Sequence, residues 1–129
     1  METTVTRNIK ISVETIYQPG YSKPLAHEYV HAYRVTIENL GMKTVQLIRR
    51  HWYIWDSNGI IREVEGEGVM GEQPIIKPNE YHQYVSGCAL RTDIGKMYGS
   101  FLMECTDETK EQFRVKIPTF RLIPPHKNN

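Results

Sequence analysis

The amino-acid sequence predicts one all-β domain, built as a two-sheet β-sandwich. Apolar and polar residues alternate with a period of two through most of the 129 residues, and helical periodicity is almost absent. Turn-forming residues divide this alternation into about seven to nine short strands, a pattern typical of a sandwich or a barrel. No repeat or linker divides the chain. We therefore expect a single domain over residues 1–129, with an ordered core from about residue 5 to 123 and short mobile tails.

The expected strands follow one another with turn chemistry between neighbours. Asn39-Leu40-Gly41 and Asp56-Ser57-Asn58-Gly59 are turn signals, since glycine takes positive φ and Asn and Asp favour turns. Residues 66–78 contain three glycines and two prolines, and are expected to form a loop with at most a brief strand. The expected strands cover residues 9–14, 33–38, 45–55, 60–65, 81–90, 97–105 and 113–122.

The longest expected strand changes the parity of its apolar positions part-way along. Val45 and Leu47 share one face of a regular strand, whereas Ile48, Trp52 and Ile54 share the other. One extra residue in the strand would turn both sets toward the core, so we expect a β-bulge near residues 48–50. Trp52 is then expected to lie in the core between the sheets.

The two cysteines are too few for a disulfide framework and lack metal-ligand spacing. We expect strands 81–90 and 97–105 to form one hairpin that turns at residues 92–95. In that register about 16 Å of strand separates Cys105 from the residue opposite Cys88. A disulfide cannot span that distance, so we expect two free, buried thiols.

Charge and terminal sequence limit the expected partners. Sixteen Lys and Arg against fifteen Asp and Glu give a formal net charge of +1, so total charge does not favour nucleic acid or an anionic membrane. The chain opens with Met1-Glu2-Thr3-Thr4-Val5, which lacks the basic start and apolar run of a secretory signal. Its apolar runs are too short to span a bilayer. We therefore expect a cytoplasmic protein that binds neither nucleic acid nor membrane.

Residues 66–71 spell G-x-G-x-x-G, with glycines at Gly66, Gly68 and Gly71. In dinucleotide-binding folds such glycines let a turn approach a pyrophosphate just before a helix N-terminus. Here Pro74 and Pro78 prevent that helix, and neighbouring glutamates would repel a phosphate. The three glycines are candidate ligand-binding residues, but their first expected role is to take unusual backbone angles.

Carboxylates beside this loop raise the question of a metal site. Glu63 and Glu65 share a strand face with Cβ atoms about 6.6 Å apart, and Glu67 lies where the loop is expected to begin. Converging carboxylates suit a hard divalent cation, although an ordinary solvated strand has the same pattern. His27 and His31 have a helical chelating spacing within a segment expected to be extended. No metal ligand or cofactor is assigned. No catalytic residue is assigned either, since no nucleophile motif is present.

Four residues of one parity on the long strand are Arg49, His51, Tyr53 and Trp55, here called the 49–55 row. If Trp52 points inward, the row faces outward as a cationic and aromatic stripe. Arg, Tyr and Trp carry much of the binding energy at protein interfaces, so the row is a candidate protein-interaction site. A covering loop or layer would explain the row equally well.

Six segments, in matching order from about Val5 to Leu122, carry a family resemblance: Glu38-Asn39-Leu40-Gly41, Val45-Gln46-Leu47-Ile48, Glu65 through Gly71, Gln73-Pro74, Tyr84-Val85-Ser86-Gly87 and Ile117-Pro118-Thr119-Phe120-Arg121-Leu122. They resemble the ApaG family. The resemblance implies an immunoglobulin/fibronectin type III-like sandwich. It also implies a protein-binding module, because similar domains occur in eukaryotic F-box proteins and in a polymerase-interacting protein. Bacterial members are nominally associated with cobalt and magnesium resistance, and the family's glycine loop has been regarded as a possible pyrophosphate motif.

These observations lead to one functional expectation and one alternative. We expect a non-enzymatic interaction module with an unidentified protein partner and an undefined oligomeric state. The alternative is a small-ligand binder. It would use the Gly66–Gly71 loop for a phosphate or pyrophosphate, or the adjacent glutamates for a divalent cation.

Overall fold

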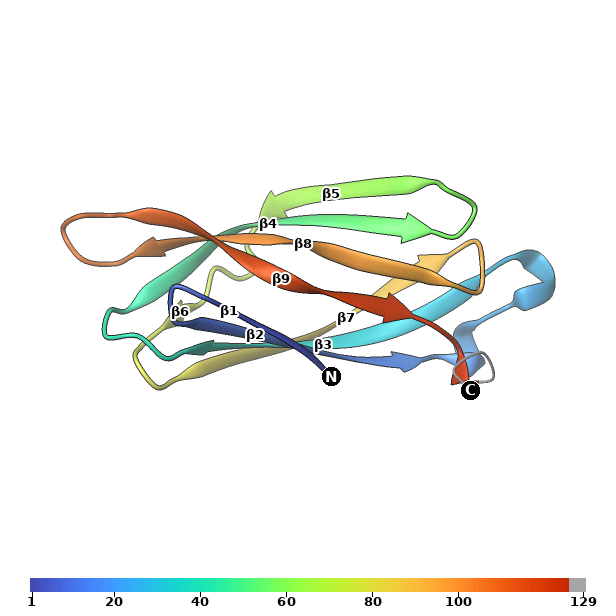
Figure 1. Cartoon of the computed structure of the whole chain (residues 1–129), viewed down its shortest axis with the longest axis horizontal. Helices are drawn as coiled ribbons and strands as arrows, with labels where there is room; N and C mark the ends of the chain where they lie inside the picture. The colour runs from blue at the N-terminus through green and yellow to red at the C-terminus, as the bar shows by residue number, and fades with distance from the viewer. Residues whose placement is uncertain (126–129) are drawn as a thin grey trace.

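The structure, a computed structural model, describes residues 1–125 and confirms the all-β sandwich. Two antiparallel sheets pack face to face, and Figure 1 shows them as two layers. Two 3₁₀ turns, Pro19–Tyr21 and Pro24–Ala26, interrupt the connection between the second and third strands. The strands are β1 (Glu2–Thr6), β2 (Ile9–Tyr17), β3 (Tyr29–Asn39), β4 (Val45–Asp56), β5 (Ile61–Glu67), β6 (Ile75–Ile76), β7 (Tyr81–Leu90), β8 (Gly95–Cys105) and β9 (Gln112–Leu122).

The first sheet has the order β1-β2-β3-β7, and the second has the order β5-β4-β8-β9 with β6 beside β4. This arrangement is the fibronectin type III-like sandwich that the resemblance implied. The core lies between the two inner faces, where the alternation of each strand places its apolar residues. Among its most deeply buried side chains are Ile11, Val35, Ile37, Leu47, Phe101, Met103, Val115 and Ile117. No helix among the described residues is long and apolar enough to cross a membrane.

A bulge in β4 confirms the expected change of parity. The pairing of β4 with β8 shifts between Leu47 and Arg49, so Ile48 is the extra residue. Leu47 before the bulge and Trp52 after it are both buried, and Trp52 is only 3% exposed. The inward position between the bulge and Trp52 belongs to Arg50, a basic residue where the alternation calls for an apolar one.

The expected hairpin of residues 81–90 and 97–105 is wrong. Strand β7 pairs with β3 over ten residues, while β8 pairs with β4, so the two strands lie in different sheets. Residues 91–94 cross between the sheets. A hairpin and a crossing between sheets use similar turn residues, so only the long-range strand pairing distinguishes them.

Both thiols are free and buried, but Cys88 and Cys105 lie at opposite ends of the sandwich and not on one hairpin. Burial raises the pKa of the Cys88 thiol.

The first strand lies close to the N-terminus and contacts both sheets. Glu2–Thr6 forms β1, which pairs with β2 and packs beside β9. The Thr4 hydroxyl donates to the Lys116 carbonyl at 2.7 Å, and the Lys116 N–H donates to the Thr6 hydroxyl at 3.3 Å. These bonds close one side of the sandwich. The expected C-terminal tail at residues 126–129 lies outside the described residues.

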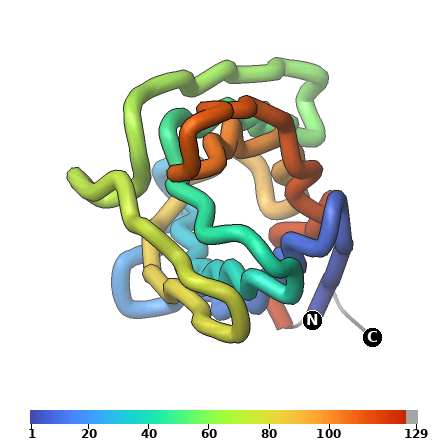
Figure 2. Tube along the Cα trace, turned by 90° about the vertical axis from the view of Figure 1, so that its left-hand side faces the viewer, coloured from blue at the N-terminus to red at the C-terminus, as the bar shows by residue number. Residues whose placement is uncertain are grey.

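The opposite side of the sandwich, between β7 and the β4–β5 pair, is where the glycine-rich connection runs. Figure 2 shows the yellow-green connection from β5 to β6 projecting on the side away from β1 and β9. The candidate glycine-rich loop therefore lies on this side of the sandwich. The candidate 49–55 row lies on the outer face of the second sheet.

Candidate functional site

The glycine-rich segment forms a tight turn. Val69 and Glu72 are antiparallel partners, with the Val69 N–H donating to the Glu72 carbonyl at 2.8 Å and the reverse bond at 3.0 Å. The two residues between them, Met70 and Gly71, have φ of 50° and 77°. Positive φ at both central positions is the requirement of a two-residue type I′ turn. The element that follows is the short strand β6 and not a helix.

Three backbone donors of this segment are already used within the fold. The Gly68 N–H donates to the Ile48 carbonyl at 2.8 Å, and the Val69 and Glu72 N–H groups bond to each other's carbonyls. A phosphate would need free N–H groups pointing at one place, as at a helix N-terminus. The turn would have to open before these groups could bind one.

Each of the three positions of the motif favours glycine for a different local reason. Gly66 lies in β5, not in the loop as expected, and pairs with Arg50. A Cβ there would come within 2.8 Å of the Arg50 Nη1. Gly68 has φ of 62°, and a Cβ there would lie 2.1 Å from the Glu72 carbonyl oxygen. Gly71 needs only its positive φ, since a Cβ there would meet open space.

These differences predict a graded response to alanine. Gly68→Ala should lower the free energy of unfolding by about 2 kcal/mol or more, because backbone strain and a clash with the main chain act together. Gly71→Ala should cost about 1 kcal/mol, from the positive φ alone. Gly66→Ala should cost less, because the flexible end of Arg50 can move. Urea unfolding of the three variants measures the order. Equal losses at Gly68 and Gly71 would contradict the close approach to Glu72.

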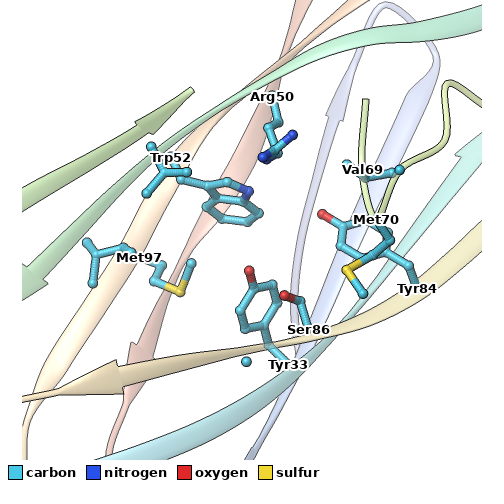
Figure 3. Close-up of a pocket in the computed structure, with 12 residues that line it drawn as sticks. Tyr33, Arg50, Trp52, Val69, Met70, Tyr84, Ser86 and Met97 are labelled. Atoms are coloured by element: carbon cyan, nitrogen blue, oxygen red, sulfur yellow. The ribbon is translucent and has the colours of Figure 1, made fainter. Parts of the chain in front are cut away.

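Arg50 is the residue near this turn that the sequence interpretation missed. Its Nη1 donates to the Glu67 carbonyl at 3.0 Å and to the Gly68 carbonyl at 3.1 Å, which ties the glycine segment to β4. Its guanidinium faces a cavity of about 310 Å³ between the sheets (Figure 3). The sequence did indicate that Arg50 points inward, because beyond the Ile48 bulge it has the same parity as the buried Trp52.

The 49–55 row lies on the opposite, outer face of the same strand. Arg49 is exposed, and His51, Tyr53 and Trp55 are partly exposed, while the alternate residues Trp52, Ile54 and Asp56 are buried. The rings of His51 and Tyr53 stack with centroids 4.7 Å apart. The row continues onto β8, because Tyr53 also stacks on Tyr98 at 5.2 Å. Lys96, another residue of β8, lies 5.2 Å from the Trp55 ring.

Beside this aromatic stack lies a shallow groove of about 510 Å³ on the outer face of the second sheet. Its floor contains the three stacked rings of His51, Tyr53 and Tyr98. Strand β9 supplies two exposed basic side chains to its border, Arg114 and Lys116. The β5 edge of the same face is acidic. The outer face therefore has a basic side at β9 and an acidic side at β5.

A histidine–carboxylate cluster occupies the acidic side of this face. The His51 Nε2 lies 2.5 Å from a Glu63 carboxylate oxygen, and its Nδ1 lies 2.9 Å from a Glu65 carboxylate oxygen. The ligand atoms of these three residues lie within 4.8 Å of one another, and the His51 side chain is 19% exposed. Glu67, expected with the other two glutamates, pairs with Arg49 and does not join the cluster.

The chelating pair considered in the sequence does not form. His27 ends a 3₁₀ turn with φ of 56° and is exposed, whereas His31 is buried in β3 opposite Cys88. Burial lowers the pKa of His31 to about 4, so its imidazole is neutral at neutral pH. Its Nε2 has no hydrogen-bond partner within residues 1–125.

Comparison with known proteins settles the family. Residues 19–105 match the family described as the ApaG domain. The chain belongs to the ApaG family. The Protein ApaG of Brucella canis is 46% identical over 125 residues, which cover 97% of this chain and 95% of that protein. The Protein ApaG of Thiobacillus denitrificans is 48% identical over 117 residues, which cover 91% of each.

A solved structure also shares the fold. The crystal structure of a Bordetella pertussis protein designated ApaA is 41% identical, with a TM-score of 0.87 over 91% of this chain and 94% of that one. The resemblance inferred from the sequence segments is therefore confirmed. The names of these ApaG relatives state a family and no catalytic activity.

Proposed function

We propose that this ApaG-family protein is a non-enzymatic interaction module that binds an acidic segment of a partner protein in the outer-face groove. The observation that carries the proposal is the stack of Tyr53 on Tyr98 beside exposed Arg114 and Lys116. Tyrosine offers a large contact area with little conformational entropy to lose, and it is enriched at interfaces. The basic border would attract an acidic chain and orient it along β9.

The hydroxyl groups of the groove support a binding role over a catalytic one. Ser100 and Thr119 line the groove together with His51. Within residues 1–125, neither hydroxyl donates a hydrogen bond to His51, whose ring nitrogens instead face Glu63 and Glu65. A nucleophile activated by histidine needs that contact.

The test is quantitative affinity capture from the cytosol of the source organism. Wild type is compared with Tyr53→Ala and Lys116→Glu, and with Lys23→Glu as a charge-matched control. Lys23 is exposed on the β2–β3 connection, away from the groove. A partner bound by wild type and Lys23→Glu should be depleted at least about tenfold on both groove variants. Equal capture by all four proteins would contradict the proposal, and so would elution of a nucleic acid in place of a protein.

A second candidate function rests on the cluster of His51, Glu63 and Glu65. One imidazole nitrogen with two carboxylates is a ligand set that Zn²⁺ and Co²⁺ accept, and it suits Mg²⁺ less well. Binding would require His51 to release one of its two glutamates. The site would then lie beside the groove, so a bound metal ion would change how the groove binds its partner.

Thermal unfolding with and without metal separates this candidate from the first. At 100 times its dissociation constant, a bound ion adds about 2.7 kcal/mol to stability. Zn²⁺ or Co²⁺ should raise the midpoint of wild type and of Glu67→Gln, and should leave His51→Ala unchanged. A rise that persists in His51→Ala would remove this candidate. Pyrophosphate in the same series should give no rise, because the N–H groups of Gly68, Val69 and Glu72 are already bonded within the fold.

A further inference from the structure

A second concave region lies inside the sandwich, separate from the outer-face groove. It is the cavity of about 310 Å³ between the sheets, on their open side and under the turn of residues 69–72. Its apolar lining includes Trp52, Val69, Met70 and Met97 (Figure 3). This volume is at the lower end of the range of small-molecule sites.

Four polar side chains converge on this apolar space: Tyr33, Arg50, Tyr84 and Ser86. The Tyr84 hydroxyl is buried and has no hydrogen-bond partner within residues 1–125. Figure 3 shows this hydroxyl directed into the cavity. A buried hydroxyl without a partner is unfavourable, and proteins rarely leave one without a reason. An acceptor placed in the cavity would satisfy it.

Arg50 supplies the one positive charge of the cavity wall. Its Nη1 holds the carbonyls of Glu67 and Gly68, and these are its only hydrogen bonds within the part of the chain that the structure describes. The Nε and Nη2 donors therefore remain for a ligand. They form a planar fork that matches the two oxygens of a carboxylate.

The charge of Arg50 reaches both buried tyrosines. Burial raises the pKa of Tyr33 and of Tyr84, and the nearby guanidinium opposes that rise in each case. Hydrogen bonding with Ser86 also opposes it at Tyr33. Both phenols therefore remain protonated at neutral pH and are available as neutral donors around a single positive charge.

We propose that this inter-sheet cavity binds a small organic molecule with one carboxylate and an apolar body. The carboxylate would accept from Arg50 and from the Tyr84 hydroxyl, and the apolar body would lie against Trp52, Met97 and Met70. One guanidinium balances one carboxylate charge, whereas a phosphate ester would carry a further charge into a wall of neutral hydroxyls. The site is distinct from the outer-face groove, so its occupancy and the proposed protein binding can each fail without the other.

The mouth of the cavity suits entry of such a molecule. Met70 is 63% exposed at the tip of the turn, and Val64 on β5 is also exposed. Methionine is flexible and adapts to different apolar shapes. Gly66 leaves the room that the Arg50 guanidinium occupies, because a Cβ at that position would collide with it.

Trp52 provides a direct optical test. A Trp55→Phe variant removes the other tryptophan, so that fluorescence reports only on Trp52 in the cavity wall. Benzoate, 3-phenylpropionate and octanoate are titrated to about 10 mM, the range of weak millimolar affinity, with their amides and phenyl phosphate as comparisons. At least one carboxylate should change the emission with saturation, and its amide should not. No saturable change with any carboxylate, or equal binding of the amide or of phenyl phosphate, overturns the proposal.

Variants in the same Trp55→Phe background locate the binding. Arg50→Gln should weaken carboxylate binding at least about tenfold, and Arg50→Lys, which lacks the fork, should weaken it less. Gly66→Ala, which displaces the guanidinium at little cost to the fold, should weaken it as well. Tyr84→Phe should weaken binding without lowering the thermal midpoint, since its hydroxyl has no protein partner to lose. Arg34→Gln, an exposed arginine paired with Glu14, should bind as wild type. Undiminished binding in both Arg50→Gln and Gly66→Ala overturns the assignment.

Discussion

Trp52→Ala is expected to lower the free energy of unfolding by about 3–5 kcal/mol, the range for deleting a large buried aromatic side chain. Trp52 is 3% exposed and meets Phe101 and Phe120 edge-on, with ring centroids 6.1 and 5.9 Å apart. Tyr33 approaches it from the facing sheet at 5.6 Å. Alanine would remove contacts to both sheets and enlarge the adjacent cavity, so the loss combines lost burial with a larger void. Urea unfolding monitored by circular dichroism measures it.

The matched control is Trp55→Ala, three residues along the same strand and on its other face. Trp55 is partly exposed and has Lys96 above its ring, so the expected loss is about 1 kcal/mol or less. A comparable loss at both positions would mean that the two faces of β4 are not divided between core and surface as described.

Asp56→Ala is expected to cost about 3 kcal/mol, because it leaves three part-buried donors without their charged acceptor. The Asp56 carboxylate is at the end of β4 and is 4% exposed. It accepts from the Arg91 N–H at 2.8 Å, from the Thr92 N–H at 3.0 Å, and from the Thr92 hydroxyl. These bonds hold residues 91–94 where the chain crosses from the first sheet to the second. Denaturant unfolding at neutral pH gives the loss.

Two further variants distinguish this role from that of an ordinary surface acid. Asp56→Asn retains one acceptor oxygen and should cost about 1–2 kcal/mol, less than alanine. Asp107→Ala, in an exposed turn beside Lys43, should leave the unfolding midpoint nearly unchanged. If Asp56→Ala is as mild as Asp107→Ala, the crossing does not depend on the carboxylate.

Much of the architecture could be predicted from the sequence, because it depends on local chemistry. Period-two alternation places Ile11, Val35 and Val115 on inward faces whatever strand they pair with, so the fold class follows. The bulge at Ile48 was predictable because a single strand cannot turn two parities to one core. Trp52 could be assigned to the core for the same reason. The family followed from the order of short segments along the chain.

Strand partners and converging side chains were decided only by the tertiary structure. Residues 91–94 carry the turn chemistry of a hairpin, but β7 gains a full ladder with β3 and β8 gains one with β4. Those pairings join residues 39 to 61 positions apart in the chain, which local propensity does not encode. His51 meets Glu63 and Glu65 only because β5 folds back on β4 in one register.

The lining of the inter-sheet cavity was also decided by contacts between segments far apart in the chain. The alternation beyond the bulge places Arg50 on the inward face of its strand. Nothing in the sequence shows that Tyr84 and Ser86 face it from the other sheet. Alternation fixes which face of its own strand a side chain occupies. Which face of which other strand it meets is set by the packing of the two sheets, where many weak long-range contacts act together.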